Sequence, residues 1–437
     1  MMVNTLNDLQ QLEELDKKHF LHPTSPIKQQ QESGPSFIFK EGRGIYLEDY
    51  KGNVVIDGMS SLWNVNVGHG REELAEVAAE QMKKLAFSSC FATYSNEPAI
   101  RLAAKLAQLT TGDLTTTFFT SGGSEANDTA YKLARHYWIL KGAPEKKKII
   151  SRTKSYHGVS MGATSATGLK PFRDFSSSIA PDFLHVDHFS TDALRERILI
   201  EGPETIAAFI AEPVQGAGGV HIAPDDYFKE IREICDFYDI LFITDEVITG
   251  FGRTGEWFGM NHYGVTPDMM CFAKGVTSGY AQLGGVILSE KMHQDFSDFS
   301  SGTLLHGYTY SGHPMACAVA LKNIEIIERE NLVRHAKEAG DLLLEGFKWI
   351  QSERKIVGNV RSLGLMGAIE MIKAREAKSK SPLIVNEAAK RGLICRSVVF
   401  DDQDTLVFAP PLTIKKKEIE KMMTILNDAI KSIEESS

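Results

Sequence analysis

The sequence has few cysteines and no long apolar run, and each absence narrows the kind of protein that it encodes. Five cysteines are scattered over 437 residues without a Cys-x-x-Cys pair, so we expect neither a disulfide framework nor a metal site. No apolar stretch approaches the roughly 20 residues of a bilayer-spanning helix. The first twenty residues lack the basic start and apolar core of a signal peptide. We therefore expect a cytoplasmic protein that has no membrane partner.

An excess of positive charge is also missing. The chain has 57 acidic and 48 basic residues, which gives a net charge of -9. This balance argues against nucleic acid as a partner. The remaining composition, 43% hydrophobic and 24% charged, is that of a globular protein. Because 437 residues are too many for one ordinary core, we expect two or three substructures.

Short apolar runs alternate with helical patterns through the middle of the chain. Branched, continuous apolar runs of this kind are typical of buried parallel strands. Strand, helix and strand in succession indicate an α/β fold with a mainly parallel central sheet and flanking helices. The predicted strands are 115–119, 148–152, 206–211, 240–244, 269–273 and 284–288, and the predicted helices are 124–140 and 227–238.

The pattern changes after about residue 330. A long amphipathic helix is followed by short strands and a last helix, which indicates a smaller α+β domain that the first sixty or so residues join. These elements are predicted at 333–353, 365–370, 393–396, 406–409 and 415–434. The predicted division is an N-terminal segment 1–65 that contributes to the small domain, a large α/β domain 66–330 and a C-terminal small domain 331–437.

Polar residues follow four of the predicted strands at the point where each ends. Strand 115–119 leads into Ser121-Gly122-Gly123-Ser124, and the next three lead into Glu212, Asp245 and Lys274. Because the carboxyl ends of parallel strands lie along one edge of a sheet, these residues are predicted to converge there, where ligands bind.

The glycine-rich turn is suited to an anion. Gly122 and Gly123 let backbone N–H groups approach a phosphate, and the following helix adds its positive end. Ser124 can cap the helix and bond a phosphate oxygen. Taken alone, these residues are equally consistent with a plain turn between a strand and a helix.

Asp245 and Lys274 allow two interpretations. A carboxylate at the end of a buried strand is unfavourable unless a cation meets it, and from these two residues alone a structural ion pair is the simpler hypothesis. The alternative is a pyridoxal-phosphate (PLP) site. There, Asp245 keeps the pyridine nitrogen protonated and Lys274 binds the aldehyde covalently.

A different cofactor is suggested by the segment 250–255, which matches the dinucleotide fingerprint G-x-G-x-x-G. The segment that follows, 256–262, has no helical periodicity, and the turn Asp245-Glu246 separates the glycines from the strand. A nicotinamide-dependent oxidoreductase is therefore the weaker hypothesis.

Seven segments in the right order resemble the class III aminotransferases, which are PLP enzymes of fold type I. The resemblance extends from Trp63 to Arg396, and the spacing between Asp245 and Lys274 also matches. The segments are LWNVNVGHG (62–70), FFTSGGSEAND (118–128), SYHG (155–158), AEPVQGAGG (211–219), TDEVITGFGRTG (244–255), PDMMCFAKG (267–275) and HGYTYSGHP (306–314).

The resemblance implies a role for each matching residue. It makes Lys274 the lysine that carries the cofactor and Asp245 the partner of the ring nitrogen, supported by Glu212. It implies a homodimer or dimer of dimers with shared active sites. The remaining implied cofactor contacts are Gly122, Gly123 and Ser124 to the phosphate, Tyr156 and Val247 to the two ring faces, and Tyr308 and Thr309 to the phosphate from the neighbouring subunit. Without the resemblance, ordinary packing would explain Tyr156, Val247 and Tyr308.

Three positions favour one subgroup. Ala217 replaces the glutamate that masks a substrate-binding arginine in the 4-aminobutyrate and ornithine subgroup, and Ile248 replaces its glutamine. The segment around Trp63 resembles the ω-amino acid:pyruvate subgroup, in which Trp63 and Tyr156 would line the substrate pocket and Arg396 would bind a carboxylate. We thus expect a small-molecule amine or ω-amino acid donor and a keto acid acceptor, pyruvate.

Other functions stay open at this point. Diaminopelargonate synthase shares the loop Gln215-Gly216-Ala217-Gly218-Gly219 but normally has two tryptophans where this chain has Leu62-Trp63. A racemase or aminomutase of the same fold would use the same cofactor residues. An inactive regulator would keep the fold without the chemistry.

Overall fold

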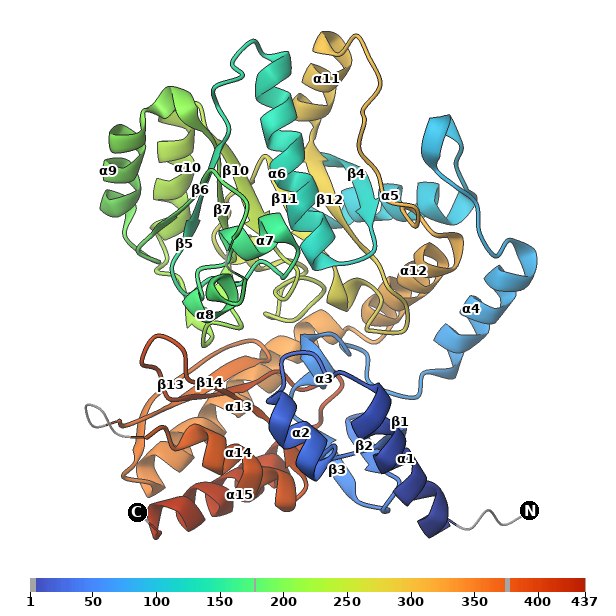
Figure 1. The fold of residues 1–437 in the computed structure, drawn as a ribbon, viewed down its shortest axis with the longest axis vertical. Helices are drawn as coiled ribbons and strands as arrows, with labels where there is room; N and C mark the ends of the chain where they lie inside the picture. Colours follow the sequence, from blue (N-terminus) through green and yellow to red (C-terminus); the bar gives the residue numbers. More distant parts are fainter. Residues whose placement is uncertain (1–4, 177, 374–377, 437) are drawn as a thin grey trace.

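The computed structural model describes residues 5–176, 178–373 and 378–436. Its largest sheet occupies the upper part of the molecule in Figure 1. Across this sheet the strands lie in the order β4 (Leu114–Thr120), β12 (Gly284–Ser289), β11 (Met269–Phe272), β10 (Leu241–Asp245), β7 (Ile206–Ala211), β5 (Lys148–Arg152) and β6 (Phe183–Val186).

The sheet is mainly parallel, which confirms the α/β prediction. Only β12 runs antiparallel to its neighbours, β11 and β4, among the pairs of this sheet that the structure describes. All six residues of β7 are buried, as expected for a strand that is covered on both faces. The six predicted strands agree closely with the structure. Strand β6 was not predicted, because it lies at the sheet edge and three of its four residues are only half-buried.

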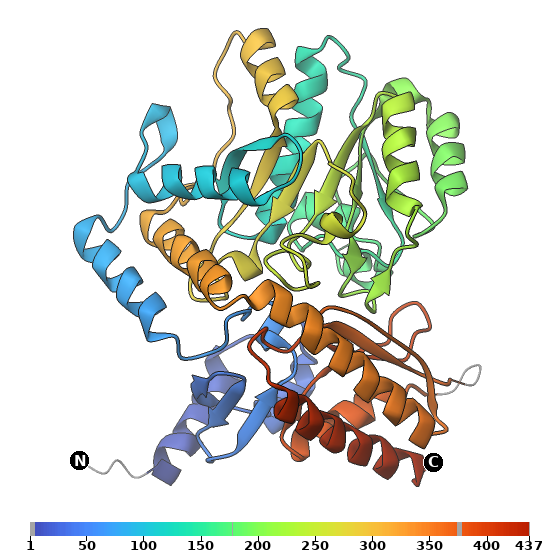
Figure 2. The ribbon, with the colours of Figure 1, turned by 180° about the vertical axis from the view of Figure 1, so that it is seen from behind.

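Helices cover both faces of this sheet (Figures 1 and 2). One face packs against α6 (Gly123–Leu140) and α11 (Glu290–Phe299). The other face packs against α9 (Thr191–Glu201), α10 (Tyr227–Phe237), α5 (Glu97–Leu109) and α12 (Pro314–Arg329). None of the described helices is long and apolar enough to cross a bilayer.

Two four-stranded sheets lie in the lower part of Figure 1. One is antiparallel, in the order β13 (Val357–Leu363), β14 (Met366–Met371), β17 (Thr405–Phe408) and β16 (Arg396–Val398), and the other is β1 (Phe39–Arg43), β2 (Tyr46–Asp49), β3 (Val54–Asp57) and β15 (Leu393–Ile394). The helices around them are α1 (Thr5–His19), α2 (Ile27–Ser33), α13 (Leu332–Glu353), α14 (Ser381–Lys390) and α15 (Lys416–Glu434).

Strand β15, from the C-terminal part of the chain, pairs in parallel with β3, from the N-terminal part. This pairing supports our proposal that segments 1–65 and 331–437 form one small domain beside a large domain 66–330. Residues 1–4, 177, 374–377 and 437 of these ranges lie outside the described residues. The single strand predicted at 393–396 is wrong: β15 and β16 belong to different sheets, with Cys395 between them.

Candidate active site

A cavity of about 590 Å³ opens where the carboxyl ends of β7, β10 and β11 face the lower sheets. Nine of the residues predicted to bind the cofactor or the substrate line it: Trp63, Gly123, Ser124, Tyr156, Glu212, Asp245, Val247, Lys274 and Arg396. Gly122 lines an adjoining cavity that shares Gly123 and Lys274. Tyr308 and Thr309 line neither cavity. The structure therefore brings the predicted strand-end residues together, apart from the two assigned to a neighbouring subunit.

Asp245 is fixed by three hydrogen bonds at the end of β10, where only 3% of it is exposed. Its Oδ2 accepts hydrogen bonds from His157 Nδ1 and Asn127 Nδ2, each at 2.8 Å. Its Oδ1 accepts one from the amide of Val247 at 3.0 Å. The buried carboxylate thus has an imidazole and an amide as partners, and it forms no ion pair with Lys274. The hypothesis of a structural Asp245–Lys274 ion pair is wrong.

Lys274 has an amine that is free to react. It begins the short 3-10 helix Lys274–Val276, one residue after the end of β11, and no described residue is hydrogen-bonded to its Nζ. Burial lowers the pKa of Lys274 to about 8, because the ammonium form loses its hydration; Asp245 and Glu212 oppose this shift, and Arg396 adds to it. An amine with such a pKa is neutral in part near pH 7 and can act as a nucleophile or a base.

Glu212 is hydrogen-bonded to the backbone around the cavity and not to Asp245. Its Oε1 accepts a hydrogen bond from the amide of Tyr156 at 3.0 Å, and its Oε2 accepts one from the amide of Gly216 at 3.2 Å. Burial raises its pKa to about 7, and the negative charge of Asp245 adds to this shift. The carboxyl group therefore positions the segment that carries Tyr156, and it reaches Asp245 only through space.

The start of α6 can receive a phosphate. A Cβ on Gly123 would lie 2.8 Å from Val247 Cγ1, so only glycine lets Val247 pack this closely against the first turn. Ser124 Oγ accepts a hydrogen bond from the Val159 amide at 3.1 Å, which leaves its own hydrogen available to an anion. The first amides of a helix have no partner within the helix and carry partial positive charge.

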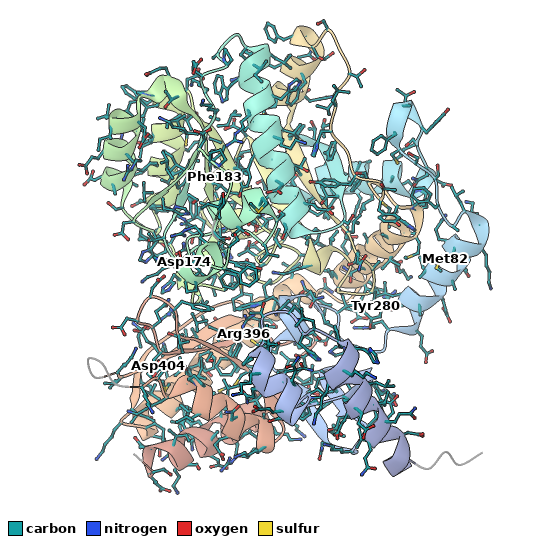
Figure 3. All side chains as sticks on the ribbon, in the orientation of Figure 1. Met82, Asp174, Phe183, Tyr280, Arg396 and Asp404 are labelled. Atoms are coloured by element: carbon teal, nitrogen blue, oxygen red, sulfur yellow. The ribbon has the colours of Figure 1, made fainter. Side chains whose placement is uncertain are left out.

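Arg396 lies at the boundary between the upper and lower parts of the molecule (Figure 3). Burial lowers its pKa, although Tyr156 opposes this shift, and no described carboxylate forms an ion pair with it. Ala217 and Ile248 line the same cavity. The guanidinium is therefore a buried cation without a described ion-pair partner in a cavity that also contains aromatic and aliphatic side chains, and it can donate hydrogen bonds to a substrate carboxylate.

The family follows from comparison with known proteins. The model of the family Aminotransferase class-III matches residues 27–430. The chain belongs to the class III aminotransferases. It is similar to the putrescine–pyruvate aminotransferase of Pseudomonas aeruginosa, with 39% identity over 94% of each chain. It is also similar in structure to a transaminase from the marine bacterium Virgibacillus, with 53% identity, a TM-score of 0.96 and coverage of 98% of this chain and 99% of that one.

A third relative bears on the cofactor. The ω-transaminase of Pseudomonas jessenii, solved in complex with PMP, has 36% identity and a TM-score of 0.93, with coverage of 97% of this chain and 98% of that one. The protein described here is thus an aminotransferase that uses pyridoxal phosphate and moves an amino group from an amine donor to a keto acid.

The residues present fit this cofactor. A fixed, buried carboxylate suits a protonated pyridine nitrogen, the free Nζ of Lys274 suits an aldehyde, and the first turn of α6 suits a phosphate. Tyr156 and Val247 line the same cavity and are apolar enough to contact a ring. The two residues that sequence reasoning left without a role are His157 and Asn127. Both lie within the matching segments 155–158 and 118–128, but only the structure shows that their donors meet Asp245.

The pKa of Lys274 predicts how the cofactor-free enzyme responds to pH. Only the neutral amine reacts with an aldehyde, so the rate of covalent uptake of pyridoxal phosphate should rise up to about pH 8 and then level off. At pH 7 the neutral fraction is roughly 300-fold larger than for an ordinary lysine of pKa near 10.5. Stopped-flow absorbance between about pH 6 and pH 10, with N-acetyl-lysine methylamide as the reference amine, measures this. A rate that keeps rising to about pH 10.5 would contradict the prediction.

Proposed function

We propose that the enzyme transfers the amino group of an ω-amino acid or amine to pyruvate. One observation supports this most strongly: the cavity holds Arg396 without a described carboxylate partner, beside Ala217 and Ile248. An unmasked arginine suits a small keto acid, and the apolar walls suit a donor that has no carboxylate next to its amine. The putrescine–pyruvate aminotransferase that resembles this chain has substrates of these two kinds.

The residues of the site have complementary tasks in this proposal. Bound pyridoxal phosphate supplies an electron sink for the bond that breaks at the amino-bearing carbon of the donor. Asp245 accepts the hydrogen bond of the protonated ring nitrogen, and His157 and Asn127 hold Asp245 in that position. Lys274 Nζ would take up the proton from the donor carbon and deliver it within the same half-reaction to the cofactor carbon on the other side of the transferred nitrogen; in the second half it would move a proton in the reverse direction, to the keto acid carbon.

The other cofactor contacts hold the ring and phosphate in place. Tyr156 and Val247 would hold the ring between them, and Glu212 positions Tyr156 by accepting a hydrogen bond from its backbone amide. Gly122, Gly123 and Ser124 would hold the phosphate through the backbone amides at the start of α6 and the hydroxyl of Ser124. Trp63, of which 2% is exposed, forms part of the wall against which the donor packs.

A panel of substrates tests the proposal. The enzyme is incubated with putrescine, 3-aminopropionate, 4-aminobutyrate and 1-phenylethylamine, each with pyruvate and with 2-oxoglutarate, and alanine and glutamate are measured. We expect amine donors to react with pyruvate at least about tenfold faster than with 2-oxoglutarate, because a second carboxylate finds no second cation besides Lys274 in the described lining of the cavity. A preference for 2-oxoglutarate would overturn the proposal.

Removing the guanidinium should affect the acceptor more than the donor. In Arg396→Ala we expect KM for pyruvate to rise about 10- to 100-fold, since hydrogen bonds to a charged partner contribute about 1.5–3 kcal/mol. The KM for putrescine should change less than about threefold. Initial rates with each substrate varied in turn measure this split, and Arg195→Ala on α9 serves as the control. Equal effects on both substrates would contradict the role of Arg396.

We also propose a cytoplasmic homodimer whose subunits share active sites. Apolar side chains near Tyr308 and Thr309 are exposed in the single chain, among them Phe91, Leu305 and Tyr310 at 49%, 90% and 59%. A partner subunit that covers them would bring Tyr308 and Thr309 to the phosphate of the other site. Sedimentation equilibrium of the holoenzyme, with Thr309→Ala as a variant expected to weaken cofactor affinity, tests the arrangement.

A further inference from the structure

The hairpin that connects β16 and β17, residues 399–404, reaches from the lower sheet to the edge of the cavity. Its strands pair antiparallel, and the chain reverses through Asp401 and Asp402, which have φ of 52° and 60°. Aspartate tolerates this left-handed conformation better than most residues. The tight turn places Phe400 at the cavity, where it lies in the lining together with Arg396.

Phe400 continues a row of aromatic rings that begins at Tyr156. The ring of Phe172, from α8 (Lys170–Asp174), lies 5.3 Å from that of Tyr156 at an interplanar angle of 68°. The ring of Phe400 lies 5.8 Å from that of Phe172 at 69°. Both contacts have the edge-to-face geometry that aromatic rings prefer. The row therefore forms a continuous aromatic wall of the cavity, to which α8 contributes Phe172 and the hairpin contributes Phe400.

A hydrogen bond fastens the hairpin to the central part of the molecule. Gln403 Oε1 and the carbonyl oxygen of Gly218 both lie near His221 Nε2, at 2.9 and 3.0 Å. Since both are acceptors, Nε2 carries the hydrogen and donates it. The side-chain amide of Gln403 donates in turn to the carbonyl of Phe400 at 3.2 Å. His221 thus holds Gln403, and Gln403 holds the backbone that carries the Phe400 ring.

We propose that Phe172 and Phe400 set the upper size of the amine donor, and that the His221–Gln403 hydrogen bond holds Phe400 in that position. The inference rests on the proposed transfer from amines to pyruvate. A narrow chain such as that of putrescine passes along the aromatic wall, whereas a donor with two fused rings requires the space that Phe400 occupies. Tightly packed aromatic rings move little, so we expect activity to fall steeply once the donor is wider than this space.

Steady-state kinetics with a narrow and a wide donor test the size limit. The holoenzyme, Phe400→Ala and Phe172→Ala are compared with putrescine and with 1-(2-naphthyl)ethylamine, using pyruvate as acceptor. In Phe400→Ala we expect the ratio of kcat/KM for the wide donor to that for putrescine to rise about tenfold or more, mainly through a lower KM for the wide donor. Phe237→Ala, on α10 and 78% exposed, is the matched control and should leave the ratio unchanged.

The outcomes separate the two proposals. Turnover by the wild-type enzyme with a ratio that neither Phe172→Ala nor Phe400→Ala changes overturns the size limit alone. If the wild-type enzyme transfers the amino group of neither putrescine nor 1-(2-naphthyl)ethylamine to pyruvate, the proposed function is overturned, and this inference with it. Phe400→Leu, which keeps most of the apolar volume, covers the case in which the alanine variant does not fold, and it should raise the ratio less than Phe400→Ala does.

The fastening hydrogen bond has a readout that is independent of turnover. In Gln403→Leu we expect amide hydrogen exchange of residues 399–404 in the holoenzyme to accelerate about fivefold or more, and the donor ratio to shift in the same direction as in Phe400→Ala. Gln403→Glu retains the acceptor for His221 but loses the donor to the Phe400 carbonyl, so its exchange should be intermediate between those of the wild type and Gln403→Leu. Equal exchange in wild type and Gln403→Leu would overturn the role assigned to His221 and Gln403.

Discussion

Lys274→Ala should lower kcat for amino transfer about 10⁴-fold or more. The substitution removes the atom, Lys274 Nζ, that is proposed both to bind the cofactor aldehyde and to carry the substrate proton. No described residue is hydrogen-bonded to Nζ, so no neighbouring group is in place to take over these tasks. Turnover of putrescine with pyruvate and the visible absorbance of the borohydride-sensitive cofactor are both measured. Lys229→Ala, at an exposed position on α10, controls for the loss of a lysine elsewhere.

Two outcomes would contradict this assignment. One is activity within about tenfold of the wild type, and the other is an unchanged borohydride-sensitive absorbance. The substitution Lys274→Ala should not lower the stability of the fold. The pKa of Lys274 is lower in the folded protein than in the unfolded chain, so its contribution to stability is unfavourable below about pH 8 and fades as the pH rises to its ordinary value. At about pH 7 the cofactor-free Lys274→Ala protein should therefore unfold at a temperature no lower than the wild type does.

Asp245→Asn should lower kcat about 10³-fold while the fold is retained. Asparagine is nearly the same size as aspartate but carries no charge, so the proton on the pyridine nitrogen loses its fixed counter-charge. The amide would also turn one nitrogen towards donors that Asp245 now accepts from, His157 Nδ1 or Asn127 Nδ2. Single-turnover kinetics with putrescine measure the loss, and absorbance spectra report the state of the bound cofactor.

Comparison variants make this result specific. Asp226→Asn, at an exposed position before α10, should leave kcat unchanged. His157→Phe keeps the carboxylate but removes one of its donors, so its effect should be smaller than that of Asp245→Asn. If Asp245→Asn retained about a tenth of the wild-type kcat, the carboxylate could not be the partner of the ring nitrogen.

Local patterns predicted much of the central sheet and of the site. Continuous apolar runs such as β7 report burial on both faces, and the polar residue that ends each run reports the edge of the sheet. For this reason the positions of Glu212, Asp245 and Lys274 along the chain were enough to place them together at one edge. The edge strand β6 was not predicted, because its half-buried residues do not form a continuous apolar run.

Contacts between distant segments could not be predicted from residue types. The sequence paired Asp245 with Lys274, because each charge needs a partner somewhere. In the structure, Asp245 accepts hydrogen bonds from His157 and Asn127 instead, and no described residue is hydrogen-bonded to Lys274 Nζ. These partners depend on which side chains the sheet and α6 bring within hydrogen-bonding distance. The division of 393–396 into β15 and β16 has the same origin, since strand partners are set by the whole fold.

The sequence by itself determined the α/β class and the class III family, and it carries the motifs from which we propose the residues that hold pyridoxal phosphate. Hydropathy, charge and chemical type are properties of each residue and its near neighbours, so they can be read along the chain. The tertiary structure alone decided that Arg396 has no described ion-pair partner, that burial lowers the pKa of Lys274 to about 8, and that the rings of Phe172 and Phe400 lie 5.8 Å apart. These features depend on distances between segments far apart in the chain, which only folding fixes.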